Sequence, residues 1–232
     1  MVELGFIHGR FQLFHNDHLN YALLAKEQCK KLIVGITSPE NAALIREDVD
    51  PHRSEAASNP FTYYERYNMV KLALLEAGVK REDFEIVPYP IERPEILYNY
   101  VPLSATSFFT IYDKWGYEKL NRLSQLGYGT IVLFDDREKK MCSTEIREKI
   151  VAGTEWKDMV PASVYQYIVE NNLTDKVINL LNNKKKKEKI YVRRYYHSCH
   201  RKRKNHPQPA EVGDCYRSGD RQDRLHRGYH HS

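Results

Sequence analysis

The run Gly9–Leu19, with the sequence GRFQLFHNDHL, directly follows a short apolar segment, Leu4–His8, that has the composition of a β-strand. Gly9 permits a tight turn and lets backbone N–H groups come close to a ligand. His15 and His18 are three residues apart at the expected start of a helix, so they share one helix face. Helix N-termini favour phosphate, and imidazole N–H groups can bind phosphoryl oxygens as their charge grows. The run therefore predicts a phosphate site; a metal site is the weaker alternative, because two histidines lack an obvious third ligand.

Strand-like and helix-like segments alternate on both sides of this run. The expected strands cover 4–8, 32–37, 84–87, 107–112 and 130–134; the expected helices cover 19–29, 61–77, 115–126, 144–151 and 161–171; and 38–60 is expected to be a long loop. Such alternation predicts an α/β fold, a Rossmann-like doubly wound parallel sheet with helices on both faces. Ligands of such sheets bind at the carboxyl ends of the strands, which again points to Gly9–His18.

The clearest helix signal is in the segment 61–77. Thr62 and Glu65 have the spacing of a capping box, and Gly78 is a typical stop. An apolar stripe at helical spacing gives this helix its expected buried face: Met69, Leu72, Ala73 and Leu75.

A second candidate phosphate site lies more than a hundred residues later, at Ser143–Arg147. Ser143 or Thr144 is expected to cap a helix that begins here, which leaves N–H groups pointing outward. Arg147 follows within one turn and can bind phosphate oxygens in a fork. Nucleotidyl transfer needs two such sites, one for the triphosphate and one for the leaving pyrophosphate. Its chemistry rests mostly on positioning and charge stabilisation, usually with a magnesium ion.

Four segments resemble the motifs of one known group of enzymes. Gly9–Leu19 resembles the GRFQPFHxGHL signature of archaeal-type nicotinamide mononucleotide adenylyltransferases, which belong to the HxGH-type nucleotidyltransferases. Cys142–Arg147 resembles the second signature of that superfamily, SGTxIR or SSTxIR, and Asn59–Arg66 resembles its NPFTxxER segment. Trp156–Pro161 is similar to the closing WxxxVP element. The resemblance extends to about Ile168, and several ordered motifs are far more specific than one short pattern.

The resemblance implies a Rossmann-like domain that transfers AMP from ATP to nicotinamide or nicotinate mononucleotide and releases pyrophosphate, with Mg²⁺ as the cofactor. No set of protein metal ligands is expected. Three residues would form the catalytic set and five would bind the nucleotide: His15, His18 and Arg147 in the first group, and Gly9, Arg10, Phe11, Ser143 and Thr144 in the second.

The sequence departs from the family pattern at two positions of the first motif. Asp17 stands where the family has glycine between the two histidines, and Leu13 stands where it has proline. A carboxylate near a triphosphate repels it unless Asp17 points away or holds a magnesium ion. One alternative is therefore a nucleotide-binding homologue with impaired catalysis.

The segments expected around the acceptor also depart from the family. Leu97 occupies the position of a tryptophan that stacks on nicotinamide, so Tyr98 or Tyr100 would have to stack instead. The segment Phe109–Gly116 replaces the usual Ser-Gly-Asn run, which indicates an altered acceptor pocket. The other alternative is therefore a cytidylyltransferase, or an adenylyltransferase for a different phosphorylated small molecule, with CTP or ATP as donor.

Charge divides the chain into an expected domain, 1–183, and a basic tail, 184–232. The tail carries 15 Lys and Arg against 5 Asp and Glu, a net charge of +10, and the remainder carries −5. Its composition predicts disorder. Two alternatives stay open: non-specific contact with nucleic-acid phosphates, and a frameshift in the A-rich coding run implied by the lysines at 184–187, which intact-mass measurement would test.

Composition excludes several classes of protein. The 232 residues carry only four cysteines, without close paired spacing, so a disulfide scaffold is not expected. No apolar stretch approaches the roughly 18 residues of a membrane span, and the N-terminus begins with a strand-like run instead of a signal segment. We expect a cytoplasmic protein without membrane contact. An oligomer is an open alternative, because related enzymes often form them.

Overall fold

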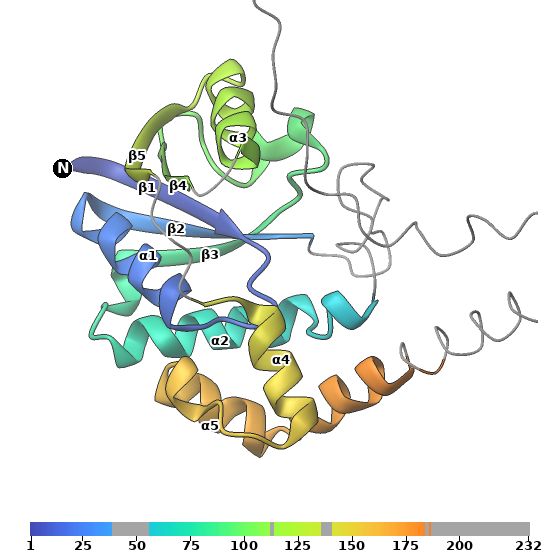
Figure 1. Cartoon of the computed structure of the whole chain (residues 1–232). Helices are drawn as coiled ribbons and strands as arrows, with labels where there is room; N and C mark the ends of the chain where they lie inside the picture. Colours follow the sequence, from blue (N-terminus) through green and yellow to red (C-terminus); the bar gives the residue numbers. More distant parts are fainter. Residues whose placement is uncertain (39–55, 112–113, 136–140, 184–185, 187–232) are drawn as a thin grey trace, which may run out of the picture. The chain divides into compact units, whose positions relative to one another are not determined.

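The side chains of the central strand, β1 (Val2–Gly9), point alternately into two hydrophobic cores. Phe6 belongs to the core on one face of the sheet and Ile7 to the core on the other, and both are fully buried. Burial on both faces explains the nearly continuous apolar run in this strand. The computed structural model (Figure 1) describes residues 1–38, 56–111, 114–135, 141–183 and 186.

Five parallel strands pair in the order β3-β2-β1-β4-β5. The strands beside β1 are β2 (Cys29–Thr37), β3 (Phe84–Tyr89), β4 (Thr106–Ile111) and β5 (Gly129–Asp135). This order is that of the doubly wound fold, in which the chain builds outward from β1 first in one direction and then in the other. The predicted Rossmann-like parallel sheet is thereby confirmed.

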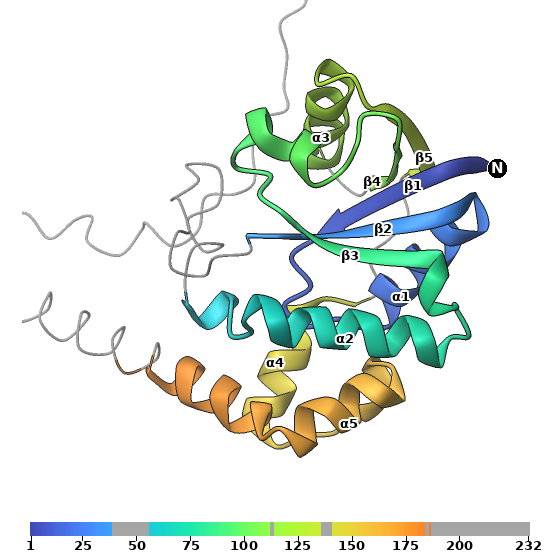
Figure 2. The same ribbon diagram turned by 180° about the vertical axis from the view of Figure 1, so that it is seen from behind.

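Helices cover both faces of the sheet (Figures 1 and 2). Of these, α3 (Lys114–Gln125) packs on β4 and β5, while α1 (Asn16–Glu27) and α2 (Tyr63–Glu76) pack on the opposite face, on β1, β2 and β3. The remaining α-helices, α4 (Ser143–Ala152) and α5 (Ala162–Glu170), extend the core below α1 and α2, and 173–183 is also helical. Short 3-10 turns cover Ala56–Ser58, Arg81–Asp83, Pro94–Asn99 and Lys157–Met159.

Most element boundaries differ from the prediction by one to three residues, and three of the differences have a physical reason. The expected helix 19–29 begins earlier, at Asn16, and Cys29 is the first residue of β2, where its thiol donates to the Ala25 carbonyl oxygen at 3.3 Å. Pro88 lies inside β3 instead of after it, which an edge strand tolerates because one side of its backbone needs no partner. Pro161 is the N-cap of α5 instead of its first helical residue.

The capping box of α2 is confirmed. The Thr62 N–H donates to Glu65 Oε2 at 2.7 Å, and the Glu65 N–H donates to Thr62 Oγ1 at 3.2 Å. The apolar stripe was predicted one residue off at its end, because Leu74 is fully buried whereas Leu75 is 42% exposed. Two adjacent leucines at the edge of an apolar stripe cannot be told apart from sequence. Only the position of the sheet decides which of the two side chains is buried.

Within the described part of the chain, no helix is both long enough and apolar enough to cross a membrane. The described residues belong to one unit by internal contacts, Met1–Lys186. Apart from Lys186, the predicted basic tail lies outside the described residues, as do Cys199 and Cys215 and most of the predicted loop 38–60.

Candidate active site

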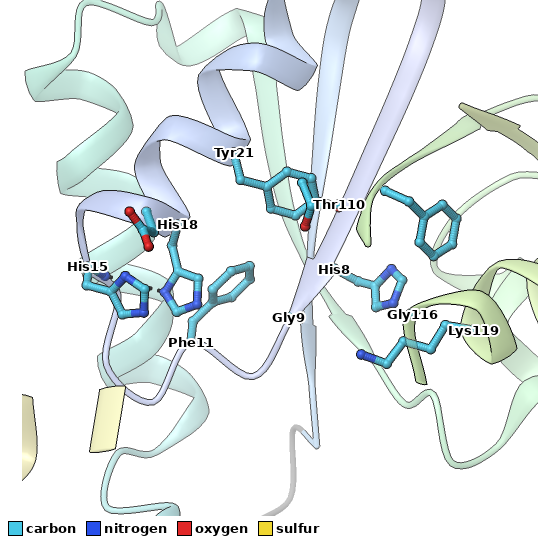
Figure 3. A pocket seen from close by; sticks show the side chains of 11 residues that line it. His8, Gly9, Phe11, His15, His18, Tyr21, Thr110, Gly116 and Lys119 are labelled. Carbon is cyan, nitrogen blue, oxygen red and sulfur yellow. Dashed lines mark hydrogen bonds between the residues drawn. The ribbon is translucent and has the colours of Figure 1, made fainter. Parts of the chain in front are cut away.

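A cavity opens where β1 and β4 separate at their carboxyl ends. These strands pair only at Gly5 with Thr106 and at Phe6 with Ser107, although both continue for several residues beyond. The cavity has a volume of about 180 Å³ and lies at the switch point of the sheet, where ligands of this fold class bind. Its lining, much of which Figure 3 shows, comprises His8, Gly9, Phe11, His15, Asp17, His18, Tyr21, Phe109, Thr110, Gly116 and Lys119.

The wall of the cavity between β1 and α1 depends on Gly9 and Phe11. A Cβ added at Gly9 would lie 2.7 Å from Phe11 Cε1, so the phenylalanine ring occupies the space that a side chain at Gly9 would need. Phe11 itself has a positive φ of 51° and is buried, and its ring meets the His18 ring edge-on at 5.1 Å between centroids. Gly9 is therefore required for close packing against a phenylalanine that holds His18 in place.

The two histidines of the first motif lie together at the N-terminus of α1. Their rings stack with centroids 3.7 Å apart and an interplanar angle of 22°. His15 is the N-cap residue, and its backbone N–H donates to His18 Nδ1 in a long hydrogen bond of 3.4 Å (Figure 3). Because Nδ1 accepts, the proton of a neutral His18 ring resides on Nε2, which makes Nε2–H a donor for an anionic oxygen.

Asp17, the residue in place of the family glycine, contacts the segment that leads into α4. Its Oδ2 accepts a hydrogen bond from the Met141 N–H at 2.9 Å, across 124 residues of sequence. Asp17 also lines the cavity. The carboxylate therefore joins the two predicted phosphate motifs, a role that glycine cannot fill.

The second motif contacts the first through backbone carbonyl groups. Ser143 Oγ donates to the Leu13 carbonyl oxygen at 3.1 Å, and Arg147 Nη1 donates to the Gln12 carbonyl oxygen. Arg147 Nη2 donates to Thr144 Oγ1 at 3.1 Å, and the arginine is only 6% exposed. The structure thus brings together two motifs that the sequence separates, although none of Ser143, Thr144 and Arg147 lines the cavity itself.

The predicted cap of α4 is wrong by one residue. Cys142 is the N-cap, and its Sγ accepts from the Glu145 N–H at 3.4 Å, while Ser143 is the first helical residue. The hydroxyl of Ser143 is instead used for the tertiary contact with Leu13. Serine is a far commoner cap than cysteine, so propensity favoured the wrong position.

Arginines form a cluster behind the Gly9–His18 turn. Burial, together with the nearby charge of Arg10, lowers the pKa of Arg147 to about 10. Arg66 is fully buried, and it donates to the carbonyl oxygens of Arg10, Thr37 and Ser38 at 2.8–2.9 Å. Sequence reasoning treated the segment 59–66 as a helix start and missed that Arg66 fixes the ends of β1 and β2. Arg10 does not line the cavity.

The opposite end of the cavity is formed by β1, β4 and α3. The His8 ring stacks on Tyr89 at 5.2 Å and meets Phe109 edge-on at 5.8 Å. Its Nδ1 is buried and has no hydrogen-bond partner among the described residues. Burial, together with the charge of Lys119, lowers the pKa of His8 to about 3, so the ring is neutral at physiological pH. Sequence analysis placed His8 only at the end of an expected strand, and it missed Lys119 because a lysine in a polar helix carries no motif.

The predicted acceptor residues divide into two groups. Phe109, Thr110 and Gly116, from the segment that departs from the family, line the cavity. Tyr98 is 61% exposed, and neither it nor Tyr100 lines the cavity. Leu97 is buried in the core beneath α3. The structure therefore does not bring an aromatic ring from 97–100 to this cavity.

In the described part of the chain, no three His, Cys, Asp or Glu side chains lie close enough together to hold a metal ion. Asp17 is the one carboxylate among the residues that line the cavity. A hard cation such as Mg²⁺ usually binds through one or two carboxylates together with substrate phosphates, so this chain offers part of such a site.

Comparison with known proteins gives concordant results. The sequence pattern of a family described as cytidylyltransferase-like matches residues 6–149. The phosphonoformate cytidylyltransferase of Streptomyces viridochromogenes is 42% identical over 173 residues, which cover 75% of this chain and 94% of that protein. The nicotinamide-nucleotide adenylyltransferase of Pyrococcus abyssi is 32% identical over 187 residues, which cover 80% of this chain and 92% of that protein.

A solved structure has the same fold. The bifunctional NMN adenylyltransferase/ADP ribose pyrophosphatase of Francisella tularensis, in complex with AMP and a manganese ion, aligns with a TM-score of 0.60 at 17% sequence identity. The alignment covers 83% of this chain but only 56% of that chain. At this identity the likeness supports the doubly wound fold and no more.

Proposed function

Because the chain belongs to the cytidylyltransferase-like family and is a nucleotidyltransferase, we propose that it transfers CMP from CTP to a small phosphonate or phosphorylated acid and releases pyrophosphate. The single observation that carries the proposal is the cavity at the switch point of the sheet, whose lining includes both the stacked pair His15 and His18 and Lys119. A nucleoside triphosphate and an acceptor that bears a phosphorus oxyanion are the substrates consistent with the family.

The choice of CTP and a small acceptor rests on two further observations. The cytidylyltransferase from Streptomyces is 42% identical to this chain over 173 residues, against 32% over 187 residues for the archaeal adenylyltransferase. Phe109, Thr110 and Gly116, from the segment that departs from the adenylyltransferase pattern, also line the cavity. Adenylyl transfer to a pyridine mononucleotide, the first expectation from the motifs, has weaker support because Leu97 is buried where the family has a stacking tryptophan.

The geometry accounts for the transfer step. An oxygen of the acceptor's phosphorus oxyanion attacks the α-phosphorus of CTP, and the bond from that phosphorus to the bridging oxygen breaks, so that pyrophosphate leaves with the bonding electrons. The N-terminus of α1 and the imidazole N–H groups of His15 and His18, which line the cavity, would stabilise the negative charge that grows in this step. No side-chain nucleophile is needed, because the acceptor is already an anion at neutral pH.

The second motif would bind the leaving group. The N-terminus of α4 and the positive charge of Arg147 lie behind the Gly9–His18 turn, to which Arg147 is bonded through Gln12. Arg10 adds a second positive charge close to Arg147. This arrangement supports binding of the β- and γ-phosphates by Ser143, Thr144 and Arg147, whose charge would stabilise pyrophosphate as it forms.

A divalent cation, which we propose to be Mg²⁺, would be held by the triphosphate together with Asp17. Asp17 Oδ2 accepts from Met141, which leaves Oδ1 as the oxygen for a cation. When bound, such a cation neutralises phosphate charge in the transition state. Asp17 then offsets, through the cation, the repulsion that a bare carboxylate would exert on the triphosphate.

Two substitutions at Asp17 separate its structural role from its charge. We expect Asp17→Gly, which restores the family residue, to lower kcat/KM about tenfold instead of raising it, because the contact with Met141 is lost. Asp17→Asn keeps an oxygen that can accept from Met141 and should retain stability, while it raises the Mg²⁺ concentration needed for half-maximal rate. Rates measured against Mg²⁺ concentration test both points, and an Asp17→Gly variant that is faster than wild type would contradict this role.

Pyrophosphate release tests the proposed function directly. The full chain is incubated with Mg²⁺, with CTP or ATP, and with phosphonoformate, phosphoglycolate, methylphosphonate or nicotinamide mononucleotide. We expect release with CTP and a small acid, and slow or absent release with nicotinamide mononucleotide. Release confined to ATP and the pyridine nucleotide would contradict the proposal and support the adenylyltransferase alternative. Tight binding of nucleotide without release under any condition would support a homologue with impaired catalysis.

A further inference from the structure

The turn Gly9–His18 is held at Gln12 by two buried hydrogen bonds to the segment that leads into α2. Gln12 Nε2 donates to the Phe61 carbonyl oxygen, and the Phe61 N–H donates to Gln12 Oε1, each at 2.9 Å. Gln12 is 3% exposed and Phe61 is fully buried, although 49 residues of sequence separate them. The side-chain amide therefore pairs with both polar groups of one backbone residue, as a neighbouring β-strand would.

We propose that Gln12 is a positioning residue, which sets the place of His15 and His18 relative to the start of α2. Gln12 does not line the cavity, so it acts on the transfer step through the turn and not by touching a substrate. The inference rests on the proposed function in one respect, because the transfer step is assigned there to the two histidines. It gives the segment Asn59–Arg66, which lines no part of the cavity, a role in the reaction.

The chemistry of the amide fits this role. A glutamine amide donates through Nε2 and accepts through Oε1 at the same time, whereas a carboxylate can only accept. A buried backbone N–H or carbonyl is costly to leave without a partner, so the pair with Phe61 is not readily exchanged for another arrangement. Phe61 directly precedes Thr62, the N-cap of α2, whose capping box with Glu65 fixes that end of the helix. Gln12 is therefore bonded to a rigid part of the fold.

A short buried connection links Gln12 to the histidines. Leu13 and Phe14, the two residues between Gln12 and His15, are both fully buried in the core. The ring of Phe14 also lies 5.6 Å from the ring of His18, measured between centroids. Because a close-packed core transmits a displacement instead of absorbing it, a shift of Gln12 moves His15 and alters the stack of the two imidazoles.

The backbone of Gln12 also contacts the second phosphate motif. Its carbonyl oxygen accepts from Arg147 Nη1, and the carbonyl oxygen of Leu13 accepts from Ser143 Oγ. The side chain and the backbone of one residue thus join the turn to both α2 and α4. The place of Gln12 therefore also affects how the histidines lie relative to Arg147, and a misplacement of about 1 Å can lower a rate by about 100-fold.

Two variants test whether the position of the turn, and not only the stability of the fold, depends on this amide. Gln12→Met keeps the length of the side chain and removes both bonds; it should lower kcat by about 10- to 100-fold and change KM for CTP by no more than about threefold. Gln12→Asn keeps the amide but is one carbon shorter, so the turn must shift to remake the bonds. It should recover more of the free energy of unfolding than of kcat.

The matched control removes a buried hydrogen bond at a distance from the turn. The Tyr128 hydroxyl donates to the Val101 carbonyl oxygen at 2.7 Å in the core on the other face of the sheet. Tyr128→Phe should lower the free energy of unfolding and leave kcat unchanged. Steady-state pyrophosphate release at saturating substrates measures kcat, and urea unfolding measures the stability of each variant.

The outcomes separate this inference from the proposed function. If wild type turns over but folded Gln12→Met or Gln12→Asn keeps at least half of its kcat, or if Tyr128→Phe loses as much, Gln12 is not a positioning residue and the proposed function stands. If wild type releases no pyrophosphate with any donor and acceptor, the proposed function fails. The NMR signals of the His15 and His18 rings then decide: a shift in Gln12→Met that is absent from Tyr128→Phe supports the inference, and unchanged signals overturn it. Gln12→Asn carries both measurements if Gln12→Met does not fold.

Discussion

Replacing His18 with alanine is expected to lower kcat by about 10²- to 10³-fold, the usual cost of removing one donor that stabilises transition-state charge. The reason is the geometry at the N-terminus of α1. His18 Nδ1 accepts from the His15 backbone, which places the donor proton on Nε2, and the stack with His15 and the edge contact with Phe11 hold the ring. The expected loss is in kcat, with KM for CTP changed by only a few fold, because the donor acts on charge that develops during the transfer.

The measurement is steady-state pyrophosphate release at saturating CTP and acceptor. His18→Gln serves as the matched variant, since its amide keeps an N–H donor and should recover part of the lost rate. The temperature of thermal unfolding should stay near that of wild type, because the His18 ring is only half-buried. A variant His18→Ala with at least half of the wild-type kcat would show that His18 does not contact the reacting phosphate.

Local signals explain which parts of the fold could be predicted from sequence. The capping box of Thr62 and Glu65 forms within four residues, and the apolar run of β1 follows from burial on both faces, so neither depends on distant parts of the chain. Boundaries depend on tertiary contacts instead. Cys29 could as well end a helix as begin a strand, and its place in β2 is decided by pairing with Val2 of β1.

In the candidate site, too, residues that are close in sequence could be predicted to lie together, whereas residues that are far apart in sequence could not. His15 and His18 are close in sequence and carry a recognisable motif, so their proximity could be foreseen. Lys119 and His8 are 111 residues apart, and they meet only because the sheet order places β4 and α3 beside β1. Asp17 could be flagged as an anomaly but not explained, because its partner, the Met141 N–H, is a backbone group that no side-chain pattern reveals.

Arg147→Ala is expected to have the largest combined effect, with kcat/KM lowered by about 10³-fold or more and the free energy of unfolding lowered by about 2–3 kcal/mol. Arg147 is buried and donates to both the Gln12 carbonyl oxygen and Thr144, so its removal leaves a buried carbonyl without a donor and releases the turn that holds His15. Urea unfolding measures the loss of stability, and pyrophosphate release against CTP concentration measures the loss of activity.

Two further variants separate the charge of Arg147 from its hydrogen bonds. Arg147→Lys keeps the positive charge but loses the planar guanidinium with its several N–H donors. Compared with Arg147→Ala, this variant should therefore recover more of the CTP binding than of the free energy of unfolding. Lys80→Ala, at an exposed position far from the cavity lining, is the control and should change neither quantity. A stable Arg147→Ala protein with normal KM for CTP would show that this arginine neither fixes the turn nor binds the triphosphate.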